Sequence, residues 1–216
     1  MGATQSGGST PTKYYQLKAK VDETNNPYFG LSEKVDGKWE STGKFDTMSG
    51  LLSSAEIKVK EFKGAKKNVF VLGFEDENEI SKVEFTHNQI THSIINTLAT
   101  NTNILSTYSI QVYKKQVKDK FYGQASVKID GEKLSWSIDP KTAPAKEPVM
   151  VNGEQFIQNG SPVFDDSKLN AFYETMFNEK VIAKLASLKS TPKEAVIAKS
   201  ADAPIHTNAD DSGLPF

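Results

Sequence analysis

Hydrophobic and polar residues alternate along most of the first 140 positions, which is the period-2 pattern of strands with one buried face. Between Lys13 and Asp22, for example, Tyr15, Leu17, Ala19 and Val21 alternate with polar or tyrosine positions. The same pattern predicts strands at residues 29–35, 38–41, 55–62, 68–74, 80–86, 106–114, 121–129 and 133–138. The dipeptides Asp36-Gly37 and Asp130-Gly131 supply the positive φ angles that tight hairpins require.

The period changes after the strand at 80–86. Ile90, Ile94, Ile95 and Leu98 recur at helical spacing and predict a helix over about residues 87–100. From residue 55 to residue 129, the predicted order is therefore three strands, this helix and two further strands. This order is typical of an OB-fold, a partly open five-stranded barrel. We therefore expect a mainly β protein, with an OB-fold domain at 13–138 that carries an N-terminal strand and hairpin extension.

A second helix is expected after Ser167, which is a plausible N-cap beside Asp165 and Asp166. Its apolar stripe consists of Leu169, Phe172, Tyr173, Met176, Ile182, Leu185 and Leu188. With a short hairpin at Asn152-Gly153, this helix forms an appendage at 139–189 that we expect to pack on the barrel. A homodimer contact is the alternative use of the stripe. Of the two tryptophans, Trp39 is expected to be partly exposed and Trp136 to be packed.

The two ends have compositions that do not support a core. Residues 1–12 are rich in Gly, Ser and Thr and lack the basic start and apolar stretch of a secretory signal, so we expect a flexible arm. Residues 190–216 are dominated by Pro, Ala, Ser, Thr, Asp and Lys, which predicts a disordered linker that ends in an acidic tip. No apolar run reaches the length of a membrane span, and we expect a cytoplasmic location.

Composition limits the chemistry further. The chain has no cysteine, and all 26 of its basic residues are lysine. Lysine suits phosphate contacts, whereas arginine is the usual reader of guanine edges, so sequence-specific DNA recognition is disfavoured. Residues 1–141 carry 19 lysines against 17 acidic residues, while residues 200–216 carry three aspartates and no lysine. A mildly basic body with an acidic tail suits an anionic ligand on the body.

An OB-fold binds its ligand between the loop that joins strands one and two and the loop that joins strands four and five. Both loops are rich in lysine here and lie beside aromatic residues, the combination that single-stranded nucleic acid requires. Alternation places Lys58 and Lys60 opposite Ile57 and Val59, and Tyr113 opposite Val112. The expected DNA-binding residues are Trp39, Lys58, Lys60, Phe62, Lys63, Lys66, Lys67, Phe70, Tyr113, Lys115, Lys118, Lys120, Tyr122 and Lys128.

The sequence ends in Asp210-Asp211-Ser212-Gly213-Leu214-Pro215-Phe216. A terminal phenylalanine offers a ring and a carboxylate to a small apolar pocket beside a basic group, and the aspartates attract a basic rim. This tip resembles the acidic C-terminal tip of bacterial and bacteriophage single-stranded DNA-binding proteins. The OB-like pattern of the body resembles the divergent bacteriophage members of that family.

The resemblance implies a protein that coats and protects single-stranded DNA in a bacterial or phage-infected cytoplasm. It also implies that Asp210, Asp211, Leu214, Pro215 and Phe216 recruit replication, recombination or repair enzymes. The N-terminal hairpin, residues 139–165 and the helix after Ser167 are not parts of the short bacterial protein, so its tetramer is not implied. The competing hypothesis is a viral structural or adaptor β-protein whose basic loops do not bind nucleic acid.

Nothing in the sequence indicates an enzyme, a metal site or a cofactor. His87, His92 and His206 are the only histidines, and the spacing of five between the first two is not that of a helical metal pair. We expect each to be a capping or surface residue. The acidic run Glu75–Glu79 lacks the glycine and alternating ligands of a calcium loop and is expected to be a hairpin turn.

Overall fold

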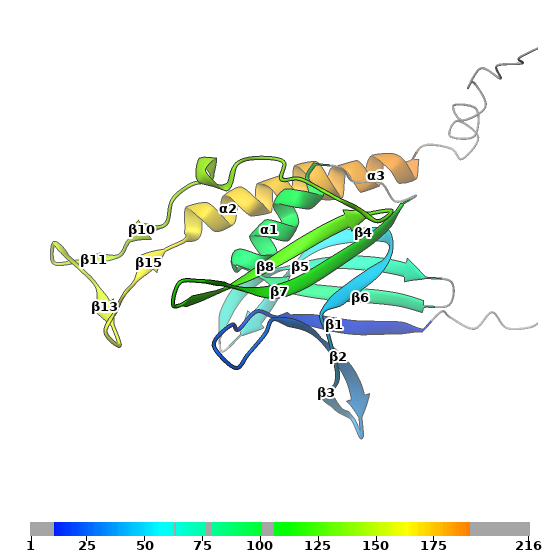
Figure 1. Cartoon of the computed structure of the whole chain (residues 1–216), viewed down its shortest axis with the longest axis horizontal. Coiled ribbons are helices and arrows are strands. Elements are labelled where there is room, and N and C mark those ends of the chain that lie inside the picture. The colour runs from blue at the N-terminus through cyan, green and yellow to red at the C-terminus, as the bar shows by residue number, and fades with distance from the viewer. Residues whose placement is uncertain (1–10, 63, 77–78, 101–105, 191–216) are drawn as a thin grey trace, which may run out of the picture.

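The computed structural model describes residues 11–62, 64–76, 79–100 and 106–190 (Figure 1). Within them, nine strands form one sheet in the order β3-β2-β1-β6-β5-β4-β7-β8-β9, and helices lie along one side of it. The sequence prediction of a mainly β protein with a C-terminal helix is confirmed. Residues 1–10 of the expected arm, Lys63, and residues 191–216 of the expected linker and tip lie outside the described residues.

The strands of the sheet follow the hydrophobic alternation closely. They are β1 (Thr12–Lys18), β2 (Tyr28–Val35), β3 (Lys38–Phe45), β4 (Thr47–Phe62), β5 (Ala65–Asp76), β6 (Glu79–Thr86), β7 (Thr107–Val117), β8 (Lys120–Ile129) and β9 (Glu132–Lys133). The strand expected at 133–138 is wrong beyond Lys133, because the backbone amides of Ser137 and Ile138 hydrogen-bond to Asn96 instead of to β8.

One face of the sheet, here called the inner face, carries the hydrophobic core. Tyr15, Phe29, Leu72, Phe85 and Ile110 are buried on it, in a single cluster that also contains the helices. A β-bulge between Leu52 and Ser54 adds one residue to β4, so that Leu52 and Ala55 both reach the core. The opposite face, here called the outer face, carries the polar partners of the alternation.

The five strands expected to close into a barrel form a continuous run in the sheet, β6-β5-β4-β7-β8. Closure of a barrel would require β6 and β8, the first and last strands of that run, to pair with each other. Instead β6 pairs with β1 in parallel over Thr12–Gln16, and β8 pairs with the short β9. The sheet is therefore open and the predicted five-stranded barrel is not confirmed, because the N-terminal strand β1 pairs with the edge of β6 that closure needs.

Helix α1 (Gln89–Leu98) packs its apolar residues on the inner face beside β8. It begins after Asn88, whose side chain accepts a hydrogen bond from the Thr91 amide at 3.0 Å and caps the first turn. Gly123 of β8 lies directly under the helix. A Cβ at this position would be 2.5 Å from Ile90 Cδ1 and 3.0 Å from Val21 Cγ2, so the missing side chain permits the close packing of α1, β8 and the segment after β1.

The C-terminal helical segment consists of α2 (Ser167–Met176), the π-helical stretch η2 (Phe177–Ile182) and α3 (Ala183–Ser190). The segment packs into the core of the same chain. Of the predicted stripe, Tyr173, Met176 and Leu185 are buried, together with Phe177 and Val181, whereas Leu188 is exposed. Asp166 occupies the N-cap position in place of Ser167, and Asp165 accepts a hydrogen bond from the Ser167 amide at 2.9 Å.

Residues 147–165 form a separate projection from the body of the protein (Figure 1). It contains three two-stranded sheets, β10 (Glu147–Pro148) with β15 (Phe164–Asp165), β11 (Met150–Val151) with β12 (Glu154–Gln155), and β13 (Ile157–Gln158) with β14 (Ser161–Pro162). Val149, Phe156 and Val163 join them through a closed triangle of backbone hydrogen bonds of 2.7–3.0 Å. The predicted turn at Asn152-Gly153 is present, with φ of 53° and 83°.

Candidate nucleic-acid interface

The outer face of β4 and β5 carries the first group of lysines. Lys58, Lys60 and Phe62 alternate along β4 and point away from Ile57, which packs against the core. Lys60 lies directly across from Lys67 of β5 in the antiparallel register. Lys66 and Lys67 are exposed, and Phe62 is half-buried. Lys58, Lys60 and Lys67 therefore share one surface with Phe62, as the alternation predicts, whereas Lys66, across from Glu61, lies on the other face of the sheet.

Two of these lysines contact carboxylates on the same surface. Lys60 Nζ lies 2.5 Å from a carboxylate oxygen of Glu84, and Lys58 Nζ lies 2.9 Å from one of Glu56. The hydrogen bond and charge of Glu56 raise the pKa of Lys58 above its ordinary value. The Lys58–Glu56 pair is open to solvent on both sides, and such pairs contribute only about 0–1 kcal/mol, so a phosphate can replace the Glu56 carboxylate at little cost.

The second group lies on β7 and β8. Tyr113 is across from Gln124, and Lys115 is across from Tyr122, so these four residues form one outer-face patch. The Tyr113 hydroxyl donates to Gln124 Oε1 at 3.3 Å, which holds the ring in place. Lys118 and Lys120 are exposed at the turn, and Lys128 is exposed farther along β8. Charges and half-buried rings are again interleaved.

Lys114 has a different role from its neighbours in this hairpin. Its Nζ donates to the backbone oxygens of Asp22 and Glu23 at 3.1 and 2.8 Å, and it lies 4.9 Å from the centre of the Phe121 ring. These contacts tie the β7–β8 hairpin to the loop after β1. Lys114 is thus engaged within the protein, whereas Lys115 projects from the opposite face.

Two further expected DNA-binding residues do not join these groups. Phe70 is only 1% exposed on the inner face, where it meets Phe177 and His87, so its assignment as a stacking residue is wrong. Trp39 belongs to β3, and three strands separate β3 from β5 in the sheet order. Lys63 and the tip residues Asp210, Asp211, Leu214, Pro215 and Phe216 lie outside the described residues.

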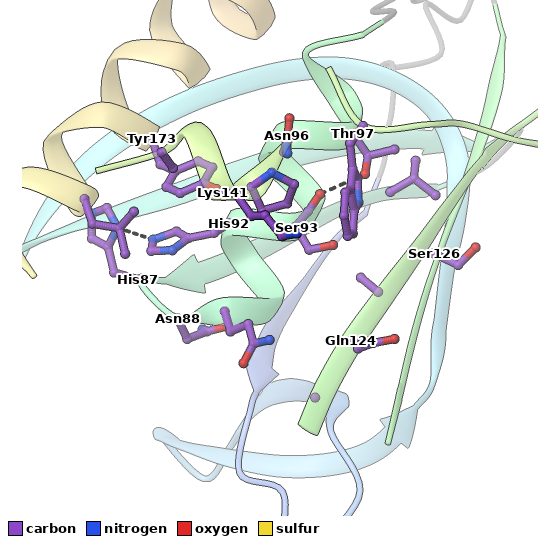
Figure 2. Close-up of a pocket in the computed structure, with 18 of the residues that line it drawn as sticks. His87, Asn88, His92, Ser93, Asn96, Thr97, Gln124, Ser126, Lys141 and Tyr173 are labelled. Atoms are coloured by element: carbon purple, nitrogen blue, oxygen red, sulfur yellow. Dashed lines mark hydrogen bonds between the residues drawn. The ribbon is translucent and has the colours of Figure 1, made fainter. Parts of the chain in front are cut away.

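Sequence reasoning also missed a cluster between α1 and α2. His87 Nδ1 lies 3.2 Å from His92 Nε2, and His87 Nε2 lies 2.8 Å from Glu174 Oε1. The His92 ring stacks on Tyr173 at 4.1 Å (Figure 2). Burial, together with the nearby charge of His87, lowers the pKa of His92 to about 4. Glu174 is 87 residues from His87, so no local pattern could have predicted the contact.

A pocket of about 1140 Å³ lies between α1, β7–β8 and the segment after β9. Figure 2 shows Ser93, Asn96 and Thr97 on its helical wall and Gln124 and Ser126 on the β8 side. Tyr113 and Lys115, from the expected DNA-binding set, also line it. Trp136 lies here as well and is exposed, so the prediction that it is packed is wrong.

No family model matches this chain, and neither the curated proteins nor the solved structures include a significant match. Within the described ranges, no helix is long and apolar enough to cross a membrane. The same ranges contain no group of three or more His, Asp or Glu side chains arranged to hold a metal ion.

Proposed function

We propose that this protein binds single-stranded DNA without sequence preference, and that it coats and protects exposed strands. The observation that carries the proposal is the outer face of the consecutive strands β5, β4, β7 and β8. There lysines alternate with half-buried rings, namely Phe62, Tyr113 and Tyr122. Cations that follow phosphates, beside rings that stack on any base, are the combination that sequence-tolerant single-strand binding uses.

We also propose that the run β6-β5-β4-β7-β8, with α1 between β6 and β7, is an opened and extended version of the OB-fold. The strand order and the position of the helix support this interpretation. In this interpretation, β1 pairs with the edge of β6 with which β8 would pair in a closed barrel. The ligand surface then lies on the outer face, where the OB-fold binds its ligands.

The decisive experiment is a titration of fluorescent oligo-dT and of a duplex of equal length with the whole protein. We expect clear preference for the single strand, because rings can stack only on bases that are not already stacked in a duplex. Absent binding, or equal binding to both, would reject the proposal. It would favour a structural or adaptor protein whose lysines serve solubility alone.

Charge and stacking should be separable in the same assay. If roughly four lysines contact phosphates, log K should fall with log salt at a slope near −3, from about −0.7 per neutralised phosphate. Changing Lys67 and Lys128, two exposed outer-face lysines, together to Ala should flatten the slope by about 1.4. Tyr122→Ala should weaken binding by about 1–3 kcal/mol at an unchanged slope, since stacking releases no counterions. If Tyr122→Ala lowers the melting temperature instead, the Tyr122 ring belongs to the core.

We further propose that Asp210, Asp211, Leu214, Pro215 and Phe216 recruit replication or recombination proteins. The support is the chemistry of these residues, an apolar ring beside acidic groups that suits a basic-rimmed pocket. Phe216→Ala is expected to abolish co-purification of such enzymes and to leave oligo-dT affinity nearly unchanged, because it removes a ring and no side-chain charge. Undiminished co-purification would assign these residues no role in recruitment.

A further inference from the structure

Trp136 has a solvent-exposed side chain on a backbone segment that hydrogen bonds fix in place. Its side chain is 55% exposed, yet the segment around it, residues 134–138, is fixed on both sides. The Leu134 amide donates to Val127 O at 2.9 Å, and the Ser137 amide donates to Asn96 O at 3.0 Å. The Asn96 side chain exchanges two hydrogen bonds with the Ile138 backbone, at 2.9 and 3.0 Å. Stacking on this ring would therefore require little additional ordering of the backbone that carries it.

The pocket beside this ring, here called the tryptophan pocket, has a basic rim. Its lysines are Lys115, Lys133, Lys141 and Lys146, and its one carboxylate is Asp166, which is paired with Lys146 at 3.6 Å. Neutral hydrogen-bonding groups of Asn88, Gln124 and Ser126 line its walls. At about 1140 Å³ it exceeds the roughly 300–1,000 Å³ typical of small-molecule sites, and its open form suits a segment of a longer chain.

The tryptophan pocket is also continuous with the outer-face lysines. Tyr113 and Lys115 belong to the outer-face patch on β7–β8 and line the pocket at the same time. Lys133 of the rim lies across from Lys128 in the β8–β9 register. The pocket thus extends around β8, from the outer face to α1 on the inner face.

We propose that the tryptophan pocket is a second part of the single-strand path, in which Trp136 stacks on a base while Lys115, Lys133 and Lys141 contact neighbouring phosphates. This inference rests on the proposed DNA-binding function. The inference adds a second DNA-binding position, away from the β4–β5 surface. A strand bound at both places would pass from the outer face around β8 toward α1.

The test uses the whole protein with Trp39→Phe, so that Trp136 is its only tryptophan. Oligo-dT should quench the Trp136 emission, and an abasic oligonucleotide of equal length should quench it far less, because it has phosphates and no base to stack. Trp136→Ala should weaken oligo-dT binding by about 5- to 150-fold, the range for one lost base–aromatic stack, while Trp136→Phe retains most of the affinity. Affinity for the abasic strand should be the same in all three proteins.

The rim lysines are tested by the salt dependence of oligo-dT binding. Lys133→Ala with Lys141→Ala should flatten the slope by about 1.4. Lys34→Ala with Lys38→Ala, an exposed pair on the β2–β3 hairpin, is the matched control and should leave it unchanged. Tight oligo-dT binding with unquenched Trp136 and an unaffected Trp136→Ala variant would overturn the pocket proposal and leave the DNA-binding function standing. If the unmodified protein fails to bind oligo-dT, both are wrong.

Discussion

Phe70→Ala is expected to lower the free energy of unfolding by about 3–5 kcal/mol, the cost of removing a buried phenylalanine. The ring is enclosed on the inner face, with centroid distances of 5.1 Å to Phe177 and 4.8 Å to His87, both edge to face. It joins β5 to the C-terminal helical segment, so the cavity would lie at the contact between them. Urea denaturation at pH 7 measures the loss.

Val59→Ala is the matched control, because Val59 lies on the neighbouring strand β4 and is 64% exposed. An exposed substitution of this kind should change stability by no more than about 0.5 kcal/mol. Phe70→Leu, a milder change, keeps the test usable if Phe70→Ala does not fold. Unaltered stability with a fall in oligo-dT affinity would restore Phe70 as a stacking residue.

The error at Phe70 has a physical cause. Alternation identifies the buried face of a strand only when the other face is polar. Val69 and Val71 are buried on the outer face, while Phe70 and Leu72 are buried on the inner face. Lys58 lies across from Val69, and Glu84 lies across from Val71. Because both faces of this stretch are covered, its sequence is uniformly apolar and shows no preferred side.

Most other strands could be predicted because alternation is a local property. Lys58 and Lys60 were placed correctly opposite Ile57, as were Tyr113 opposite Val112 and Lys128 opposite Val127. The open sheet could not be predicted in the same way. The parallel pairing of β1 with β6 joins Thr12 to Ile80 across a long stretch of chain, and parallel pairing leaves no turn signal.

The tryptophan pocket could not be predicted from the sequence either. Its walls come from α1, β7–β8, the segment after β9 and the start of α2, and no spacing along the chain relates these elements. Trp136 looked like a core residue because Leu134, Trp136 and Ile138 share the period of a strand. In the structure Leu134 and Ile138 pack against the core, while hydrogen bonds to Asn96 and Val127 fix a non-strand backbone that leaves Trp136 exposed.

Acid should destabilise the protein through His92 in a window between about pH 6.5 and pH 4. Burial and the neighbouring His87 and Lys146 lower the pKa of His92 to about 4, from about 6.5 in an unfolded chain, while Asp166 opposes the shift. Within that window the unfolded state binds more protons than the folded state, so stability is full above pH 6.5 and falls as the pH approaches 4. At 1.36 kcal/mol per pKa unit, the loss reaches about 3 kcal/mol.

His92→Gln removes the titrating ring and should therefore flatten this part of the pH profile. In urea denaturation at pH 7, 5.5 and 4, the stability difference between the unmodified protein and the variant should shrink by up to about 3 kcal/mol toward pH 4. Carboxylates titrate equally in both proteins and cancel in the difference. His206→Gln, which changes the histidine outside the described residues, should follow the unmodified protein. Parallel profiles for His92→Gln and the unmodified protein would show that His92 is not the group responsible.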